Sequence, residues 1–386
     1  MKEVRELLNP IHYLEQKQGE LFKTYHNLHE LAEPSWQEKQ TSAYIRKRLT
    51  DAGISVRTFD QHYGLIAEIP GETEEVVALR ADMDALLQEV DGVVRPNHSC
   101  GHDAHSTMVM HTALAIALSG IIPKRTLRFI FQPAEEKGQG ALQMMKDGAL
   151  RNVQYLFGLH VRPSFEVPIG KASPIIIHSS AGTVKGTIKG VQAHAARPED
   201  GINAIEAAAL LVYKLKQIKL PKEETGSIKM TQLQSGNNAT NIIPETAVFS
   251  LDVRAQTNNA MDKLKQLATT AIDEVVLETG ATISWSMDEY VPAAIENKAA
   301  KNLAASAITS ILGSANLIPS CISPGGEDFH FYTLENPGIK ATMIGLGCGL
   351  SPGLHHPQMT FNQDALIYGA QILTAAVLLA SEQERM

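Results

Sequence analysis

The feature that most constrains the fold of this chain is an alternation of short apolar runs with helix-like segments, interrupted once in the middle. Apolar runs of strand length occur at Leu65–Ile69, Val76–Ala81, Leu127–Phe131 and Leu156–Val161. Apolar residues follow helical spacing at Ile11–Leu31, Thr41–Leu49, Ala104–Ser119 and Ala141–Leu150. Strands that alternate with helices predict an α/β fold, with a mixed, largely parallel sheet and helices on both of its faces.

The interruption begins near Ser180 and has a different order of elements. We expect a strand, a helix, two strands, a helix and a strand at Thr183–Lys189, Ile202–Ile218, Ser227–Leu233, Thr246–Arg254, Asn258–Glu278 and Thr282–Met287. This β-α-β-β-α-β order is typical of a small ferredoxin-like α+β domain. After Pro292 the α/β pattern returns, with a helix at Lys301–Leu312 and a buried strand at Thr342–Leu346. We therefore expect a domain of residues 182–292 inserted into one formed by residues 1–181 and 293–386.

Composition excludes several classes of function. Lys and Arg number 34 and Asp and Glu number 42 among the 386 residues, which gives a net charge of −8. An acidic chain without a basic block does not favour binding to nucleic acid or to an anionic membrane. The N-terminal segment is charged, unlike a signal peptide, and no apolar run approaches the roughly 18 residues of a membrane span. Three cysteines are too few for a disulfide framework, so we expect a cytoplasmic protein.

The densest group of reactive side chains precedes the helix expected at Ala104–Ser119. It reads Asn97-His98-Ser99-Cys100-Gly101-His102-Asp103-Ala104-His105. A tight turn at Gly101 could aim Cys100 and His102 at one centre, and thiolate and imidazole are good ligands for zinc and its neighbours. The alternative is a buried thiol, with Asp103 merely capping the helix.

A second group, Gln132-Pro133-Ala134-Glu135-Glu136, directly follows an apolar strand. Adjacent carboxylates are costly to hold together after a buried strand unless a cation or a proton relieves their repulsion. One carboxylate could bind a metal while its neighbour takes a proton from the attacking water. The alternative is an ordinary solvated turn.

Further candidate ligands follow later strands of the predicted sheet. His160 ends the run Leu156–Val161, and two adjacent histidines occur in Leu354-His355-His356-Pro357. Alone, each would be an ordinary core or surface histidine. Together with Cys100, His102 and a glutamate, His160 and one of the two adjacent histidines provide five candidate ligands, more than the four of a closed structural zinc site. This number suits two metal ions that share a water molecule.

Longer stretches resemble a known family. Leu79-Arg80-Ala81-Asp82-Met83-Asp84-Ala85-Leu86 and His98-Ser99-Cys100-Gly101-His102-Asp103-Ala104-His105 resemble signature stretches of the M20 metallopeptidase superfamily. They are most similar to its amidohydrolase branch, which holds aminoacylases, hippurate hydrolases and indoleacetyl-amino-acid hydrolases. Further matches, in family order over nearly the whole chain, are Gln132-Pro133-Ala134-Glu135-Glu136, Gly158-Leu159-His160, Gln192-Ala193-His194-Ala195-Ala196, Asn241-Ile242-Ile243-Pro244, Gly326-Glu327-Asp328-Phe329 and His355-His356-Pro357.

The resemblance implies a two-metal catalytic domain with an inserted lid domain. The metal ligands that it implies are Cys100, His102, Glu136, His160 and His355. His355 is chosen over His356 because the family ligand lies two residues before the proline. Glu135 corresponds to the general base. The two ions would be zinc, manganese, cobalt or nickel.

The resemblance also assigns roles around the ligands. His194 corresponds to a histidine that supports the substrate carbonyl, often from a partner subunit, so a homodimer through the lid domain is implied by analogy. Asn241 and Arg254 correspond to positions that bind polar groups of the substrate. Without the family, Arg254 would be an exposed charge at a strand end.

Three acids, Asp82, Asp84 and Asp103, are expected to orient ligands, with a surface turn as the alternative for Asp82 and Asp84. His98 and His105, which flank the cluster, could do the same. We expect ordinary structural roles for the other histidines: His12, His26, His29, His62, His111, His178 and His330.

The chain departs from the family pattern next to this cluster. The segment Ala85–Asn97 is shorter than in relatives, with Leu87 where proline is common and Asn97 where methionine is usual. The missing loop borders the site in relatives, so the departure affects the pocket and the substrate but not the ligands.

The sequence therefore predicts a metal-dependent amidohydrolase that cleaves N-acyl amino acids or similar small amides. One alternative is a dipeptidase or other exopeptidase on the same scaffold. The other is a non-catalytic metal-binding protein, because a fold alone does not fix function. A cysteine nucleophile is a poorer explanation, since it would leave Glu135, Glu136 and two histidines without a shared task.

Overall fold

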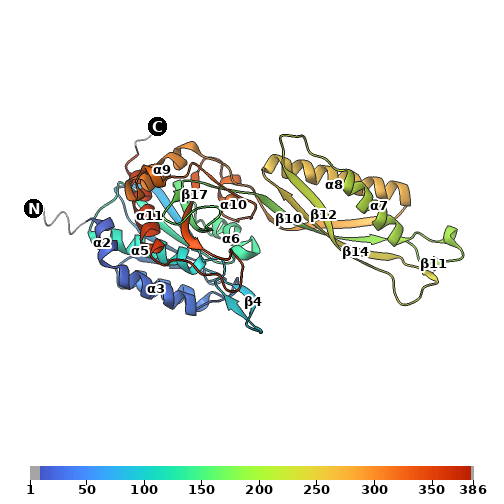
Figure 1. The fold of residues 1–386 in the computed structure, drawn as a ribbon, viewed down its shortest axis with the longest axis horizontal. Coiled ribbons are helices and arrows are strands. Elements are labelled where there is room, and N and C mark those ends of the chain that lie inside the picture. The colour runs from blue at the N-terminus through green and yellow to red at the C-terminus, as the bar shows by residue number, and fades with distance from the viewer. Residues whose placement is uncertain (1–8, 384–386) are drawn as a thin grey trace, which may run out of the picture. The chain divides into compact units, whose positions relative to one another are not determined.

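The computed structural model describes residues 9–383, which divide into two compact units. The first unit comprises the residues up to Ile177, Ile295–Ser323 and the residues from Asp328 onward. The second comprises His178–Ala294 and Pro324–Glu327. The chain thus leaves the first unit near the start of the segment 182–292 that was expected to form an inserted domain (Figure 1). The short stretch Pro324–Glu327 also belongs to the second unit.

The first unit contains a seven-stranded sheet in the order β1-β2-β6-β3-β7-β17-β8. Its strands are β1 (Ser55–Thr58), β2 (Leu65–Ile69), β3 (Thr73–Asp82), β6 (Arg125–Gln132), β7 (Val153–Pro163), β8 (Ala172–Ser173) and β17 (Lys340–Leu350). The four central strands, β6, β3, β7 and β17, run parallel, and the outer strands pair antiparallel. The prediction of a mixed, largely parallel sheet is confirmed.

Helices surround this sheet (Figure 1). They are α2 (Pro10–Gln16), α3 (Gln18–Glu30), α4 (Lys39–Asp51), α5 (His102–Ser119), α6 (Gly140–Lys146), α9 (Lys298–Leu312), α10 (His330–Leu334) and α11 (Ala365–Ser381). Helix α11 packs against both α5 and α9, all three pack on central strands, and α2 and α3 cover α5. Helix α5 is therefore buried on nearly all sides, which explains why its polar and apolar residues are not separated onto two faces.

The parallel arrangement gathers the polar ends of the strands. Asp82 and Gln132 are the last residues of β3 and β6, and they are paired in register. His160 lies near the end of β7. Because parallel strands end at the same edge of a sheet, residues from distant parts of the sequence meet there, as in other open α/β sheets.

The second unit contains a four-stranded antiparallel sheet in the order β12-β14-β10-β15. Its elements are β10 (Ser180–Lys189), α7 (Ala204–Gln217), β12 (Gly226–Ser235), β14 (Thr246–Ala255), α8 (Asn258–Thr279) and β15 (Thr282–Val291). This is the predicted β-α-β-β-α-β order. Both helices pack against the sheet around buried residues such as Leu211, Phe249 and Leu264.

Several short elements were not expected from the sequence. The segment Ala85–Asn97 contains a hairpin of β4 (Leu86–Val90) and β5 (Val93–Asn97). A two-stranded ribbon joins β11 (Ala193–His194) to β13 (Ile242–Ile243), and another joins β9 (Ile176–His178) to β16 (Cys321–Ser323). The helix predicted at Ala141–Leu150 ends at Lys146, because a turn with Gly148 at φ 78° follows it.

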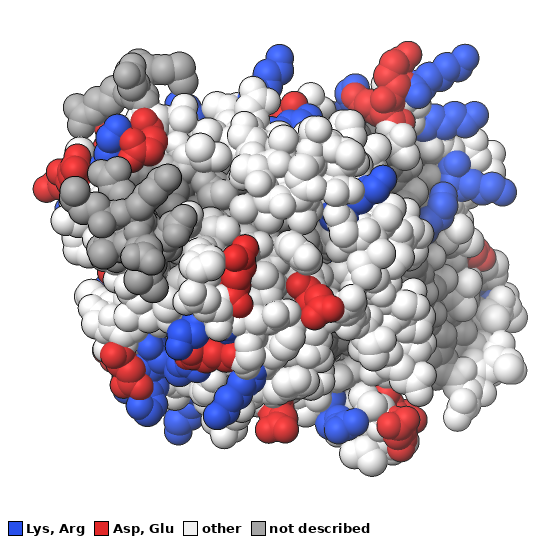
Figure 2. All heavy atoms as spheres, turned by 60° about the vertical axis from the view of Figure 1, so that its left-hand side comes forward, with Lys and Arg blue, Asp and Glu red and all other residues white. Residues whose placement is uncertain are grey.

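The surface carries both signs of charge. On the face shown in Figure 2, Lys and Arg side chains lie among Asp and Glu side chains. Among the residues that the structure describes, no helix is both long and apolar enough to span a membrane.

The turn that carries Glu135 and Glu136 packs against Gly140 at the start of α6. A Cβ atom at Gly140 would lie 1.7 Å from the carbonyl oxygen of Pro133. We therefore expect Gly140→Ala to lower the melting temperature by several degrees, since backbone displacement of this kind costs about 1–3 kcal/mol. Gly19→Ala, in the first turn of α3 with no atom within 4 Å of the added carbon, is the control and should not destabilise. Equal melting temperatures would contradict the tight packing.

Candidate metal centre and active site

The candidate site lies where α5 begins, next to the ends of β3, β6 and β7. Cys100 and His102 flank Gly101, which adopts a left-handed conformation with φ 88°. A Cβ atom at Gly101 would lie 2.5 Å from the Val161 side chain, so both the backbone angle and the close approach require glycine. The turn predicted from Cys-Gly-His is therefore present.

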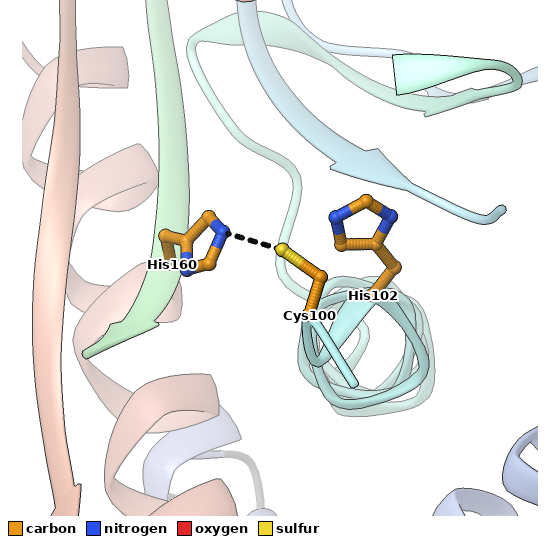
Figure 3. Close-up of side chains that lie close together, drawn as sticks. All are labelled: Cys100, His102 and His160. Carbon is orange, nitrogen blue, oxygen red and sulfur yellow. Dashed lines mark hydrogen bonds between the residues drawn. The ribbon is translucent and has the colours of Figure 1, made fainter. Parts of the chain in front are cut away.

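The first group of candidate ligands is Cys100, His102 and His160, all buried (Figure 3). One donor atom from each residue lies within 4.8 Å of the other two. His102 donates from Nδ1 to Oδ1 of Asp84 at 3.2 Å, and His160 donates from Nδ1 to the Val161 carbonyl at 2.6 Å. In its neutral form, each ring thus carries its proton on Nδ1 and its lone pair on Nε2, the tautomer that a metal ligand needs.

The second group is Cys100, Glu136 and His355, again with donor atoms within 4.8 Å of one another. Nε2 of His355 lies 3.6 Å from Oε1 of Glu136. Because Cys100 belongs to both groups, its thiolate could bridge two cations. The structure therefore brings together all five ligands implied by the sequence, in two sets of three that share one sulfur.

The donor atoms fit a pair of cations. Among the described residues, Nε2 of His102 and Oε1 of Glu136 are buried polar atoms without a hydrogen-bond partner. Such an atom costs about 1–3 kcal/mol when it stays unsatisfied. Burial also raises the pKa of Glu136 to about 7 and raises the pKa of the Cys100 thiol well above its usual value. A pair of bound cations, one in each group, would satisfy Nε2 of His102 and Oε1 of Glu136, and it would favour the ionised forms of Cys100 and Glu136.

Asp84 connects the histidine ligand to the glutamate turn. Its Oδ1 accepts from the Glu135 amide and its Oδ2 from the Glu136 amide, both at 3.1 Å, in addition to the bond from His102. The Ser35 hydroxyl donates to Oδ2 at 2.7 Å. Burial opposes ionisation of Asp84, but the hydrogen bond from His102 and the other donors hold its pKa below the usual value. Asp84 is buried and is not part of a surface turn, and its role in orienting the ligands stays a prediction.

Asp82 is also buried and contacts His105, whose ring lies beside that of His160; its orienting role stays a prediction. Its Oδ1 accepts from Nδ1 of His105 at 2.7 Å, and Nε2 of His105 accepts from the Val161 amide at 3.0 Å. His105 therefore links the end of β3 to the residue that follows His160.

A buried network surrounds Asp82, and the sequence patterns assigned no role to its members. Arg80 forms an ion pair with Asp82 and donates to Asp328 at 2.8 Å. Gln132 donates to both carboxylate oxygens of Asp328. All of these residues lie in motifs that suggested the family, but nothing in their spacing indicated which side chains pair.

Asp103 has different surroundings. Its Oδ1 accepts from the Ala104 amide at 2.8 Å, and its Oδ2 lies 2.7 Å from Nδ1 of His29. The carboxylate therefore caps the first turn of α5 and binds a histidine for which only a structural role was expected. A role of Asp103 in orienting the ligands stays a prediction.

Glu38 is a residue that the sequence did not single out. It is fully buried, and its Oε1 accepts from the Ala134 amide at 2.8 Å and from the Trp36 amide at 3.0 Å. Ala134 has a φ of 53°, unusual for a residue with a side chain, and it directly precedes Glu135. Glu38 and Asp84 together therefore bind three consecutive amides of the glutamate turn. No local pattern around Glu38 indicates a contact almost a hundred positions away.

Glu135 lies beside the ligands. Its Oε2 is 3.8 Å from Nε2 of His102, and its Oε1 accepts from the Asp328 amide at 3.4 Å. A carboxylate at this place can exchange a proton with a water molecule or a substrate held near the ligands.

Three predicted residues lie in the second unit. His194 lies on β11 and Asn241 directly precedes β13, and the Ala195 amide donates to the Asn241 carbonyl at 2.9 Å. The Ala196 amide donates to Nδ1 of His194, so a neutral ring would carry its proton on the exposed Nε2. Arg254 lies on β14 and binds Asp252 with Nη2 to Oδ2 at 2.9 Å. Their roles toward the substrate stay predictions.

The chain matches a known protein family and known relatives over most of its length. The model of peptidase family M20/M25/M40 matches residues 78–379. N-acetylcysteine deacetylase of Bacillus subtilis is 31% identical, over 92% of this chain and 95% of its own length. IAA-amino acid hydrolase ILR1-like 2 of Arabidopsis thaliana is 30% identical, over 91% of this chain and 83% of its own.

Solved structures show the same fold. The YXEP protein of Bacillus subtilis, described as a dinuclear metal-binding peptidase of the M20 family, has a TM-score of 0.80 at 27% identity, and the match covers 95% of this chain and 99% of that one. A putative aminohydrolase from methicillin-resistant Staphylococcus aureus has a TM-score of 0.86 at 25% identity, over 96% and 98% of the two chains.

The burial of Glu38 generates a prediction about stability and pH. Burial raises the pKa of Glu38 to about 7 from its usual value of 4.5. Its contribution to the stability of the metal-free protein is therefore fully present below about pH 4.5 and is lost as the pH rises through about 7. Glu38→Gln keeps an acceptor for the Ala134 amide without the charge. It should exceed wild type in unfolding free energy by up to about 3 kcal/mol at about pH 8, and by much less at about pH 5.

Urea unfolding of chelator-treated protein at the two pH values measures this difference. Glu74→Gln, which replaces an exposed carboxylate on β3, is the matched control and should show little change. A stability difference between Glu38→Gln and wild type that is equal at both pH values would contradict burial of a charge as its origin.

Proposed function

Because this chain belongs to peptidase family M20/M25/M40 and is a hydrolase of amide bonds, we propose that it cleaves N-acyl amino acids with the help of two divalent cations. The observation that carries the proposal is the pair of ligand groups that share Cys100, with Glu135 next to them. Cys100, His102 and His160 would hold one ion, and Cys100, Glu136 and His355 the other. Thiolate and imidazole donors favour zinc, cobalt or nickel, with manganese also compatible.

Two cations in such a site supply an activated water molecule and polarise the amide carbonyl. The residues of the chain do the rest. Glu135 accepts a proton from the attacking water as the oxygen–carbon bond forms. It then donates that proton to the amine nitrogen as the carbon–nitrogen bond breaks, so that a carboxylic acid and an amine are released. Asp84 accepts hydrogen bonds from the amide of Glu135 and from the ring of His102, and it thereby fixes the position of the base relative to the ligand.

The substrate class is supported by the relatives and by the second unit. The two curated relatives described above are named for an N-acetyl amino acid and for amino-acid conjugates of IAA. His194 would donate from Nε2 to the developing oxyanion, and Asn241, next to the same ribbon, would bind a polar group of the substrate. Arg254 would bind a substrate carboxylate, which would either displace Asp252 from the guanidinium group or bind that group together with Asp252.

The role of Glu135 is tested by Glu135→Gln. The amide keeps the size of the side chain but cannot accept the proton, so we expect turnover to fall by about 10²–10⁴-fold while both metal ions are retained. Turnover of an N-acetyl amino acid and metal content by mass spectrometry are measured on the same preparation. A metal-replete variant with wild-type turnover would remove Glu135 from its role.

The substrate class is tested with a panel. N-acetyl, N-benzoyl and N-indoleacetyl amino acids are compared with free dipeptides, using protein reconstituted separately with Zn²⁺, Mn²⁺ and Co²⁺. We expect kcat/KM for the best acyl amino acid to exceed that for every dipeptide. The reverse order would favour the dipeptidase interpretation of the same scaffold.

A further inference from the structure

We propose that the β4–β5 hairpin, through the side chain of Gln88, positions His355. The hairpin would thereby determine whether the chain holds the ion assigned to Cys100, Glu136 and His355. Gln88 does not touch the candidate ligand atoms, and it acts as a positioning residue. The inference rests on the proposed two-ion site, but it makes a separate claim, namely that the two ion positions depend on different parts of the chain.

The Gln88 amide makes three hydrogen bonds at this place. Its Nε2 donates to the carbonyl oxygen of His355 at 2.8 Å. Its Oε1 accepts from the Ser99 hydroxyl at 2.7 Å and from Nδ2 of Asn97 at 3.1 Å. The donor end of one side chain therefore binds the loop of His355, while the acceptor end is fixed by residues that lead directly to Cys100.

Two further bonds fix the same loop. Nδ2 of Asn97 also donates to the Pro357 carbonyl at 3.0 Å, so its two protons serve Gln88 and Pro357. The His355 amide donates to the Ser99 carbonyl at 2.8 Å. The hairpin and the turn that follows it thus bind the peptide groups on both sides of His355 and the carbonyl of Pro357.

His355 needs this support more than the other histidine ligands do. His102 begins the buried helix α5 and His160 belongs to the central strand β7, and both are at most 4% exposed. His355 lies outside helices and strands, its side chain is 55% exposed, and its φ is 64°. Non-glycine residues adopt such a φ only when their surroundings impose it.

The short connection places Gln88 on the correct face of the hairpin. Asp91 and Gly92 form a two-residue turn with φ values of 52° and 80°, the signs that a type I′ hairpin turn needs. In the resulting register Leu86 pairs with Asn97, so Gln88, two residues further on, shares the face of Asn97. A slip of one residue would turn Gln88 to the opposite face. The departure of Ala85–Asn97 from the family length therefore bears on how His355 is held.

The experiment compares metal binding by wild type, Gln88→Glu and Gln88→Met. Gln88→Glu keeps an acceptor for Ser99 and Asn97 but loses the donor to His355, and Gln88→Met loses all three bonds. Glu89→Met, at the neighbouring exposed position on the other face, is the matched control. Zn²⁺ is titrated into chelator-treated full-length protein in competition with a chromogenic chelator, which gives the stoichiometry and both dissociation constants.

Both Gln88 variants should weaken one Zn²⁺ by about 10–100-fold and leave the other within about threefold of wild type, because loss of a group that orients a ligand typically has that effect. The control should bind both ions like wild type. The inference would be overturned if the Gln88 variants bound both ions as tightly as wild type, or if they lost affinity for both ions equally. Wild-type protein that binds fewer than two Zn²⁺ ions would instead contradict the proposed function, so the two failures are distinguishable.

Discussion

The candidate site depends on one buried carboxylate, that of Asp84. A buried charge is stable only when its oxygens are hydrogen-bonded, and Asp84 meets this requirement with a histidine ring, a hydroxyl and two consecutive amides. The same bonds that satisfy the charge orient His102 and fix the turn that presents Glu135 and Glu136. Removal of the carboxylate would therefore release ligand and base together. Glu38 extends the arrangement by one amide, at the strained residue Ala134.

Most of the fold could be predicted from the sequence, because each central element has a local signature. The apolar runs of the parallel strands, the helical spacing around them and the β-α-β-β-α-β segment follow from periodicity alone. The five candidate ligands could also be named, since they lie at strand ends or in motifs that resemble a family. The structure brings the donor atoms of these five residues together. The roles of His194, Asn241 and Arg254 toward the substrate stay predictions.

The contacts that support the ligands could not be predicted in the same way. Glu38 binds Ala134, and Gln88 binds the carbonyl of His355, more than two hundred positions away. No periodic pattern and no motif in the sequence links the two members of either pair. Such contacts depend on how loops meet after the sheet has formed. The length of the segment Ala85–Asn97 was visible in the sequence, but its consequence for His355 required the register of the hairpin.

The central claim, that five side chains hold two cations around one shared thiolate, is tested most directly by anomalous X-ray scattering from crystals of protein reconstituted with Zn²⁺. The account predicts two peaks about 3.5–4 Å apart, one bound by Cys100, His102 and His160, and the other by Cys100, Glu136 and His355. A single peak, or two peaks that do not share the sulfur of Cys100, would contradict it.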